Sequence, residues 1–239
     1  MEKGKKLYEG KAKIIYATTD DNIYWLAYKD SVTAFNGEKQ DEITGKGQLN
    51  NEISSLMFEK LHDMGIQSHF INKISPTEQL VKKVSIIPVE VVVRNIAAGS
   101  MSKRLGLEEG MQLNEPVTDF HYKNDILGDP LVTQNHIILL NIASIEQIEK
   151  MKEIALIVNK ALIQIFYQVG ITLVDFKLEF GLDTCEDIIL ADEISPDTCR
   201  LWDVKSDKKL DKDIYRKNLG DLISGYQQVL DRLRSTGHV

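Results

Sequence analysis

The chain has 239 residues, of which 43% are hydrophobic and 27% charged, and its formal net charge is −7. This composition is typical of a globular protein with a large core, and the length allows one large domain or two small ones. The negative charge excludes a general attraction to nucleic acid or anionic membranes, so an anionic ligand must be held by local clusters of Lys and Arg. No apolar run reaches the roughly 20 residues that span a bilayer, and the N-terminus lacks the apolar core of a signal peptide. We therefore expect a cytoplasmic protein that binds neither nucleic acid nor membrane.

Short strands are predicted in the first part of the chain. The β-rich runs at residues 6–18 and 22–35 are separated by a polar turn, which indicates an antiparallel meander. A helix is predicted over residues 47–65, where apolar residues recur at helical spacing. The remaining strands of this part are expected at 69–74, 79–84 and 86–96.

The second half begins with irregular sequence and continues into a long helix. Ser144 and Gln147 form a capping box, and an apolar face then runs down to Gly170. The runs 173–181 and 186–195 lie close together in the sequence and indicate a β-hairpin. The last helix is predicted near residues 212–234.

This order of elements favours an α+β fold over a doubly wound sheet. We expect a β-rich N-terminal lobe over residues 1–84 and a mixed C-terminal lobe over residues 85–239, which together form one functional unit. A cleft between two such lobes is an ordinary place for a ligand.

Charged residues alternate with apolar ones in "LVDFKLEFG", residues 173–181. Side chains alternate between the two faces of a strand, so Asp175, Lys177 and Glu179 share one face while Val174, Phe176, Leu178 and Phe180 share the other. Asp192 ends the second strand of the hairpin and can approach these acids. Facing carboxylates would bind Mg²⁺, which takes one or two carboxylates together with water and phosphate oxygens. The strand pattern alone favours a solvated charged face instead.

Two lysines follow a glycine turn in "YEGKAK", residues 8–13. Gly10 would let backbone N–H groups approach a phosphate, and Lys11 and Lys13 would supply positive charge. Lysines on an edge strand also prevent unwanted strand pairing, so this signal is weak alone. The sequence has no Walker A motif and no GxGxxG motif.

A strand that ends at Arg94 turns through Ala-Ala-Gly into a predicted short helix near Ser100. A helix N-terminus, a hydroxyl and a guanidinium together suit a phosphate group. An ordinary strand–turn–helix junction with Ser100 as N-cap explains the same residues equally well. Arg200 and Arg216 are either surface residues or further anion contacts.

Cysteine and histidine give no sign of a metal site. Cys185 and Cys199 match no zinc spacing, so we expect two free thiols. The five histidines show no paired-ligand pattern, and we assign no chemistry to them.

Long segments of the chain resemble the phosphoribosylaminoimidazole-succinocarboxamide synthase (SAICAR synthetase) family. The resemblance rests on "PVEVVVRNIAAGS" and "LVDFKLEFG", with "KLYEGKAK", "TAFNG", "LVKK", "KRLGLEEG", "DEISPDTCRLWD" and "DKDIYRKNLG" in the expected order. It implies a two-lobed α+β fold akin to ATP-grasp enzymes, with the nucleotide between the lobes. It also implies ATP-dependent ligation of L-aspartate to carboxyaminoimidazole ribonucleotide (CAIR) through an acyl phosphate intermediate. The implied cofactor is Mg²⁺, and the implied oligomeric state is a homodimer.

The resemblance also implies roles for individual residues. The predicted ATP contacts are Gly10, Lys11, Ala12 and Lys13 at the phosphates and Val81, Lys82, Lys83 and Val84 at the adenine. The predicted catalytic residues are Lys177 and Asp175, the metal ligands Glu179 and Asp192, and the substrate contacts Arg94, Ser100, Arg200 and Arg216.

Several points stay open at this level. They are the oligomeric state, the number of metal ions, the order of binding, the group that deprotonates the aspartate amine and the role of Asn36. The division of Arg200 and Arg216 between ribonucleotide phosphate and aspartate is open as well. The alternative function is another ATP-dependent carboxylate–amine ligase or phosphotransferase on the same scaffold, and a regulatory nucleotide-binding module is a further one.

Overall fold

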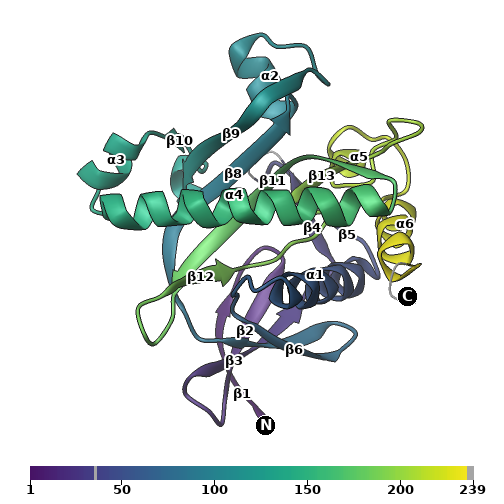
Figure 1. Ribbon diagram of the computed structural model, residues 1–239. Helices are drawn as coiled ribbons and strands as arrows, with labels where there is room; N and C mark the ends of the chain where they lie inside the picture. The colour runs from purple at the N-terminus through teal and green to yellow at the C-terminus, as the bar shows by residue number, and fades with distance from the viewer. Residues whose placement is uncertain (35–36, 236–239) are drawn as a thin grey trace.

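The structure is a computed structural model that describes residues 1–34 and 37–235, so Asn36 and His238 lie outside the described residues. An antiparallel sheet forms the first part of the fold, in the order β1-β2-β3-β7-β6 (Figure 1). Its strands are β1 (Lys3–Glu9), β2 (Lys13–Thr18), β3 (Ile23–Tyr28), β6 (Phe70–Ser75) and β7 (Glu78–Lys82). The predicted meander is confirmed for β1 to β3. The end of the predicted 22–35 run instead forms β4 (Ser31–Ala34), which pairs with β5 (Lys39–Glu42) in a separate hairpin.

Helix α1 (Lys46–Asp63) packs against this sheet and confirms the helix predicted over residues 47–65. It ends before Gly65, whose φ of 80° is the left-handed conformation that glycine adopts without strain. The buried face of α1 includes Ile53, Met57, Phe58 and Leu61.

A second, larger sheet has the order β10-β9-β8-β11-β12, and β13 also pairs with β11. Its strands are β8 (Ser85–Ile96), β9 (Gln112–Tyr122), β10 (Leu131–Val132), β11 (Ile171–Leu182), β12 (Ile188–Ala191) and β13 (Cys199–Asp203). One edge of β11 pairs with β8, while β13 and then β12 pair along the other edge, all antiparallel. The predicted hairpin is therefore the β11–β12 pair.

Helix α4 (Ile145–Gln168) lies across one face of the second sheet (Figure 1). The predicted capping box is present, since the Ser144 and Gln147 side chains each accept a hydrogen bond from the other residue's backbone N–H. The charged side chains of β11 lie on the opposite face of the sheet. No helix in the described part of the chain is long and apolar enough to cross a membrane.

The second half differs from expectation in three places. Its beginning was predicted to be irregular, but this region includes the end of β9, which has few buried side chains and is defined by its backbone pairing with β8. Strand β13 was not predicted. The predicted helix at 212–234 is two helices, α5 (Asp213–Arg216) and α6 (Leu222–Ser235), because Asn218 (φ 53°) and Gly220 (φ 137°) leave the helical conformation between them.

The remaining elements are α2 (Gly99–Leu105), the 3₁₀ turn η2 (Asp125–Leu127) and α3 (Gln134–Leu139).

A buried ion pair joins the first part of the chain to the last. Lys46, at the start of α1, is 1% exposed, and its Nζ lies 2.6 Å from Oδ2 of Asp197. The hydroxyl of Tyr226 on α6 donates to the other oxygen of Asp197 at 2.6 Å. Because a buried charge is costly without its partner, this pair holds α1 against the loop before β13.

We predict that Lys46→Met lowers the free energy of unfolding by about 3 kcal/mol, because it leaves the Asp197 carboxylate buried without its cation. Guanidinium denaturation measures the change. Lys150→Met is the matched control, since Lys150 is 52% exposed and pairs with Glu153 on the surface of α4. Equal stability of the two variants would contradict a structural role for the buried pair.

Candidate active site

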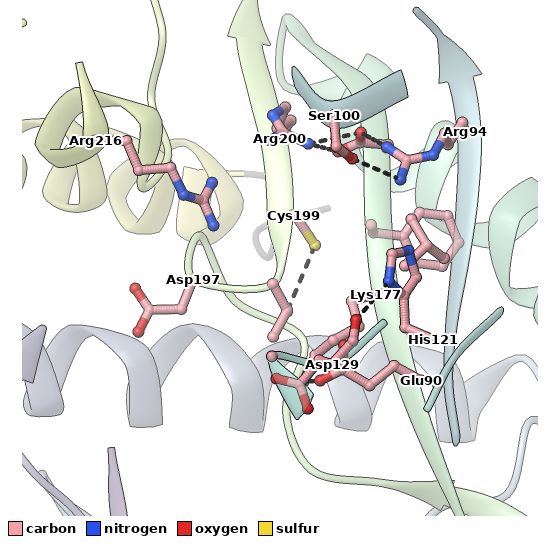
Figure 2. Close-up of a pocket in the computed structure, with 15 residues that line it drawn as sticks. Glu90, Arg94, Ser100, His121, Asp129, Lys177, Asp197, Cys199, Arg200 and Arg216 are labelled. Atoms are coloured by element: carbon pink, nitrogen blue, oxygen red, sulfur yellow. Dashed lines mark hydrogen bonds and ion pairs between the residues drawn. The ribbon is translucent and has the colours of Figure 1, made fainter. Parts of the chain in front are cut away.

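The face of the second sheet opposite α4 carries rows of side chains from neighbouring strands. Arg94 on β8 lies opposite Asp175 on β11, which in turn lies opposite Arg200 on β13. Two positions along, Val92 lies opposite Lys177. The last row contains His121 on β9, Glu90 on β8 and Glu179 on β11. A cavity of about 380 Å³ opens over these rows, lined by Glu90, Val92, Arg94, Ser100, His121, Gly128, Asp129, Asp175, Phe176, Lys177, Asp197, Thr198, Cys199, Arg200 and Arg216 (Figure 2).

The charged face of β11 is buried, so the interpretation as a solvated strand face was wrong. Asp175 and Glu179 are each 3% exposed. The predicted apolar face also needs one correction, because the pairing with β13 shifts register between Leu173 and Asp175. Leu173 joins the main core, whereas Val174 packs in a separate small cluster with Trp202.

Lysines and carboxylates alternate beside one end of the cavity, where Lys177 and Glu90 line it and their ion-pair partners lie behind them. Nζ of Lys177 lies 2.7 Å from Oε1 of Glu179, 3.1 Å from Glu90 and 3.2 Å from Oδ2 of Asp192. Lys123 pairs with the second oxygen of Glu179, and Lys13 pairs with the second oxygen of Asp192 and with Glu193. We call this set the lysine–carboxylate cluster; its members are Lys13, Lys123, Lys177, Glu90, Glu179, Asp192 and Glu193.

Mutual pairing keeps Asp192 and Lys177 charged. Burial disfavours the ionised form of Asp192, but the ammonium groups of Lys13 and Lys177 outweigh it and hold the pKa of Asp192 well below its usual range. Burial likewise opposes the charge on Lys177, yet Glu179, Asp192 and Glu90 raise its pKa well above the ordinary value. Asp192 and Lys177 are therefore ionised at neutral pH, in a cluster whose members are four acidic residues and three lysines.

The cluster can bind a divalent cation only together with ligand oxygens. Among residues 1–34 and 37–235, no group of three or more His, Cys, Asp or Glu side chains is arranged to hold a metal by itself. Glu179 and Asp192 do converge, since both contact Nζ of Lys177. Two carboxylates fit Mg²⁺, which completes its coordination with water and phosphate oxygens.

The two predicted ATP-binding stretches, residues 10–13 and 81–84, both belong to the first sheet or its connections. Gly10 begins the turn between β1 and β2, where its N–H donates to the carbonyl of Lys13 at 2.8 Å. Lys11 is half-exposed, with its Nζ 2.6 Å from Asp125 of η2, whereas Lys13 points into the lysine–carboxylate cluster. The 81–84 segment ends β7 and connects the two sheets; within it, the N–H groups of Lys82 and Lys83 already donate to protein carbonyls.

Arginines gather at the other end of the cavity. Arg94 is 2% exposed, and its guanidinium donates to Asp119 at 2.7 Å, Asp175 at 2.9 Å and Oγ of Ser100 at 3.4 Å. Arg200 donates to Asp175 at 2.8 Å and so shares that carboxylate with Arg94. Figure 2 shows Arg94, Ser100 and Arg200 together, with Arg216 approaching from another side.

Two expectations about this end need correction. Helix α2 begins at Gly99 with Ala98 as N-cap, and no side chain caps it, so Ser100 is not the N-cap. Arg216 ends the short helix α5 and does not begin the last helix.

Sequence reasoning missed several cavity residues. Glu90 could have been found, because it alternates with Val89, Val91 and Val93 as regularly as Lys177 does with its neighbours. His121 and Asp129 lie in the region predicted to be irregular, and no local pattern marks them. Lys123 carries no local signal either, since only the pairing of β9 with β8 brings it to Glu179.

Gly99 allows Arg200 to reach its position. A Cβ on Gly99 would lie 2.4 Å from Nη2 of Arg200, and the φ of Gly99 is 56°. We predict that Gly99→Ala displaces the guanidinium and lengthens its contact with Asp175 beyond the about 4 Å of an ion pair. A crystal structure of the variant measures this distance.

Gly106→Ala is the control for backbone strain alone. Gly106 ends the same helix with a φ of 67°, but a Cβ there would meet nothing within 4 Å. It should leave Arg200 in place, and an unmoved Arg200 in Gly99→Ala as well would refute the steric argument.

Comparisons with known proteins agree with this geometry. The sequence matches the SAICAR synthetase family over residues 6–233. It is 59% identical to the phosphoribosylaminoimidazole-succinocarboxamide synthase of Bacillus subtilis (strain 168), over 99% of this chain and 98% of that protein. The crystal structure of the synthase from Ehrlichia chaffeensis is 51% identical with a TM-score of 0.94, over 96% of this chain and 98% of that one. A SAICAR synthetase in complex with ADP is 48% identical with a TM-score of 0.92, over 95% and 96% of the two chains. The chain therefore belongs to the SAICAR synthetase family.

Proposed function

We propose that this protein is a phosphoribosylaminoimidazole-succinocarboxamide synthase of purine biosynthesis. It ligates L-aspartate to CAIR with ATP and releases SAICAR, ADP and phosphate. Family membership and the related structure with bound ADP support the reaction and the nucleotide. The observation that carries the proposal is one cavity lined by arginines at one end and by Lys177 and Glu90 at the other, with Glu179 and Asp192 paired to Lys177 behind it.

The cavity suits a ribonucleotide that lies along β8. Arg94 and Glu90 are four residues apart on this strand, or about 13 Å at roughly 3.3 Å per residue. The 5′-phosphate would lie at Arg94, Ser100 and Arg200, where guanidinium groups can donate to it in pairs. The carboxylate of the base would then lie near Lys177.

ATP would approach from the first sheet. Gly10, Lys11, Ala12 and Lys13 would contact the phosphates, and the segment 81–84 would receive the adenine. Lys13 supports this direction, because it extends from β2 to Asp192 and Glu193 in the cluster. Magnesium, held by Glu179 and Asp192, would supply positive charge at the phosphate oxygens.

The chemistry requires two displacements. The CAIR carboxylate attacks the γ-phosphorus of ATP and ADP leaves, which gives an acyl phosphate. The α-amine of aspartate then attacks the acyl carbon, loses a proton and expels phosphate as the amide forms. Lys177 offsets the repulsion between two anions in the first step, since positioning and charge supply most of the catalysis in such transfers. Asp175 lines the same cavity and completes the proposed catalytic pair.

The proposal extends to the organisation of the chain and its location. We divide it at residues 84 and 85 into a β-rich lobe and a mixed lobe, akin to ATP-grasp enzymes, with the nucleotide between them. The connection between the two sheets at this point supports the division. We assign the enzyme to the cytoplasm, where purine nucleotides are made.

The proposal also includes a homodimer. Large apolar side chains are exposed on η2, β10 and α3, which follow one another in the chain, and Figure 1 shows β10 and α3 at one side of the molecule. Ile126 is 95% exposed and Leu139 75%, and Leu127, Leu131 and Leu140 are exposed as well. A surface of this kind favours association with a protein partner, and we assign it to a second copy of the chain.

We predict that Lys177→Ala and Glu179→Ala each lower ADP release by at least about 100-fold, because the first removes the cation that offsets repulsion between the reacting anions and the second removes a proposed magnesium ligand. The assay omits CAIR, aspartate and ATP in turn, and release by the unchanged protein should require all three. Lys150→Ala, on the exposed surface of α4, is the control. Release that proceeds without CAIR but with another carboxylate would indicate a different ligase on this scaffold.

We predict that Leu139→Glu converts a dimer to a monomer, because it places a charge in the apolar contact. Sedimentation velocity measures the mass. Leu105→Glu, at the end of α2 and 56% exposed, is the control and should leave the dimer intact. A monomeric unchanged protein, or a dimer that survives Leu139→Glu, would refute this interface.

A further inference from the structure

One carboxylate outside the cavity contacts two of the cavity's arginines. Asp213 begins α5 and is 1% exposed. Its Oδ1 accepts from Nη1 of Arg216 at 2.8 Å, and its Oδ2 accepts from Nε of Arg200 at 3.3 Å. Both arginines line the cavity, whereas Asp213 does not. Nζ of Lys217 lies 3.5 Å from Oδ2 of Asp213 and also forms an ion pair with Glu109.

A second buried acid fixes the backbone that carries this carboxylate. Oδ1 of Asp211 accepts from the N–H of Asp213 at 2.7 Å, and Oδ2 accepts from the N–H of Leu201 at 2.8 Å. Leu201 is next to Arg200 on β13, so Asp211 ties the strand that holds one arginine to the helix that holds the other. Asp211 is fully buried.

The two acids differ in charge because their neighbours differ. Burial and the adjacent charge of Asp213 raise the pKa of Asp211 to about 7. Burial also acts on Asp213, but Arg200 and Arg216 outweigh it and lower its pKa to about 2. Asp213 is therefore an anion at neutral pH.

The two arginines depend on Asp213 to different degrees. Arg200 is held at Nε by Asp213 and at Nη1 by Asp175, with its guanidinium against Gly99. Arg216 is 30% exposed, and among the described residues Asp213 is its ion-pair partner. A free arginine side chain samples many rotamers and loses that entropy when a ligand fixes it. Holding the guanidinium in place beforehand reduces the cost of binding an anion.

We propose that Asp213 is a positioning residue that holds Arg200 and Arg216 ready for the anionic groups of the two substrates other than ATP. This inference rests on the proposed function, since it takes CAIR and aspartate as those substrates. It assigns to Asp213 a role in affinity without contact with either one. The binding of ATP, at the other end of the cavity, does not depend on it.

The test is steady-state kinetics of Asp213→Asn with each substrate varied in turn. We expect the KM for CAIR, for aspartate or for both to rise about tenfold, the effect of losing a hydrogen bond to a charged group. The KM for ATP should stay within about twofold of the unchanged value. Asp213→Glu retains the charge and should recover part of the affinity. Circular dichroism and a melting curve establish that each variant is folded.

Asp203→Asn is the matched control. Asp203 lies on the same strand as Arg200 and pairs with Arg232 at 2.6 Å, but it does not line the cavity. It should change none of the three KM values. If Asp213→Asn does not fold, the comparison is made with Asp213→Glu alone, whose longer side chain should raise the same KM values by a smaller factor.

Unchanged KM values for both CAIR and aspartate in a folded Asp213 variant would overturn the inference. An equal rise in all three, including ATP, would also overturn it, because that result indicates general damage to the site. Absence of CAIR- and aspartate-dependent ADP release in the unchanged protein would refute the proposed function instead. The two failures are therefore distinguishable.

Discussion

The burial of charged side chains on β11 is the constraint on which the rest of the site depends. Asp175 and Glu179 are removed from water at the centre of a sheet, where an unpaired carboxylate would be strongly destabilising. Arginines on β8 and β13 neutralise the first, and Lys177 on β11 and Lys123 just after β9 neutralise the second. The sheet order brings these cations within hydrogen-bonding distance, because β8 and β13 both pair with β11 and β9 pairs with β8.

This arrangement separates two kinds of anion site along one strand. The arginine end presents planar guanidinium groups that suit phosphate and carboxylate groups, while the other end presents ammonium groups beside carboxylates. Lys13 enters the second end from the first sheet, so the two sheets meet where phosphoryl transfer is proposed. Beyond the cavity, Asp213 accepts a hydrogen bond from Arg200, and Asp211 accepts hydrogen bonds from the backbone of Leu201 and Asp213. These contacts link β13 to α5.

Local sequence predicted an element correctly wherever the pattern that defines the element lies within contiguous residues. The periodicity of α1 and α4, the capping box at Ser144 and the hairpin around residue 183 are all properties of contiguous residues, and each is present in the structure. Strand β9 was missed because it buries few side chains and is held by its neighbours. The break between α5 and α6 was missed because apolar spacing continues across Asn218 and Gly220.

The sequence by itself determined the α+β class, the family and the stretches that carry charge, since these depend on residue type and spacing. It did not determine whether the charged face of β11 is exposed to solvent or buried. Tertiary structure decided that point, and it also decided which acid meets which base, because the partners come from strands up to 179 positions apart. A pattern within one segment shows which side chains share a face, but the packing of other segments sets their exposure and their partners.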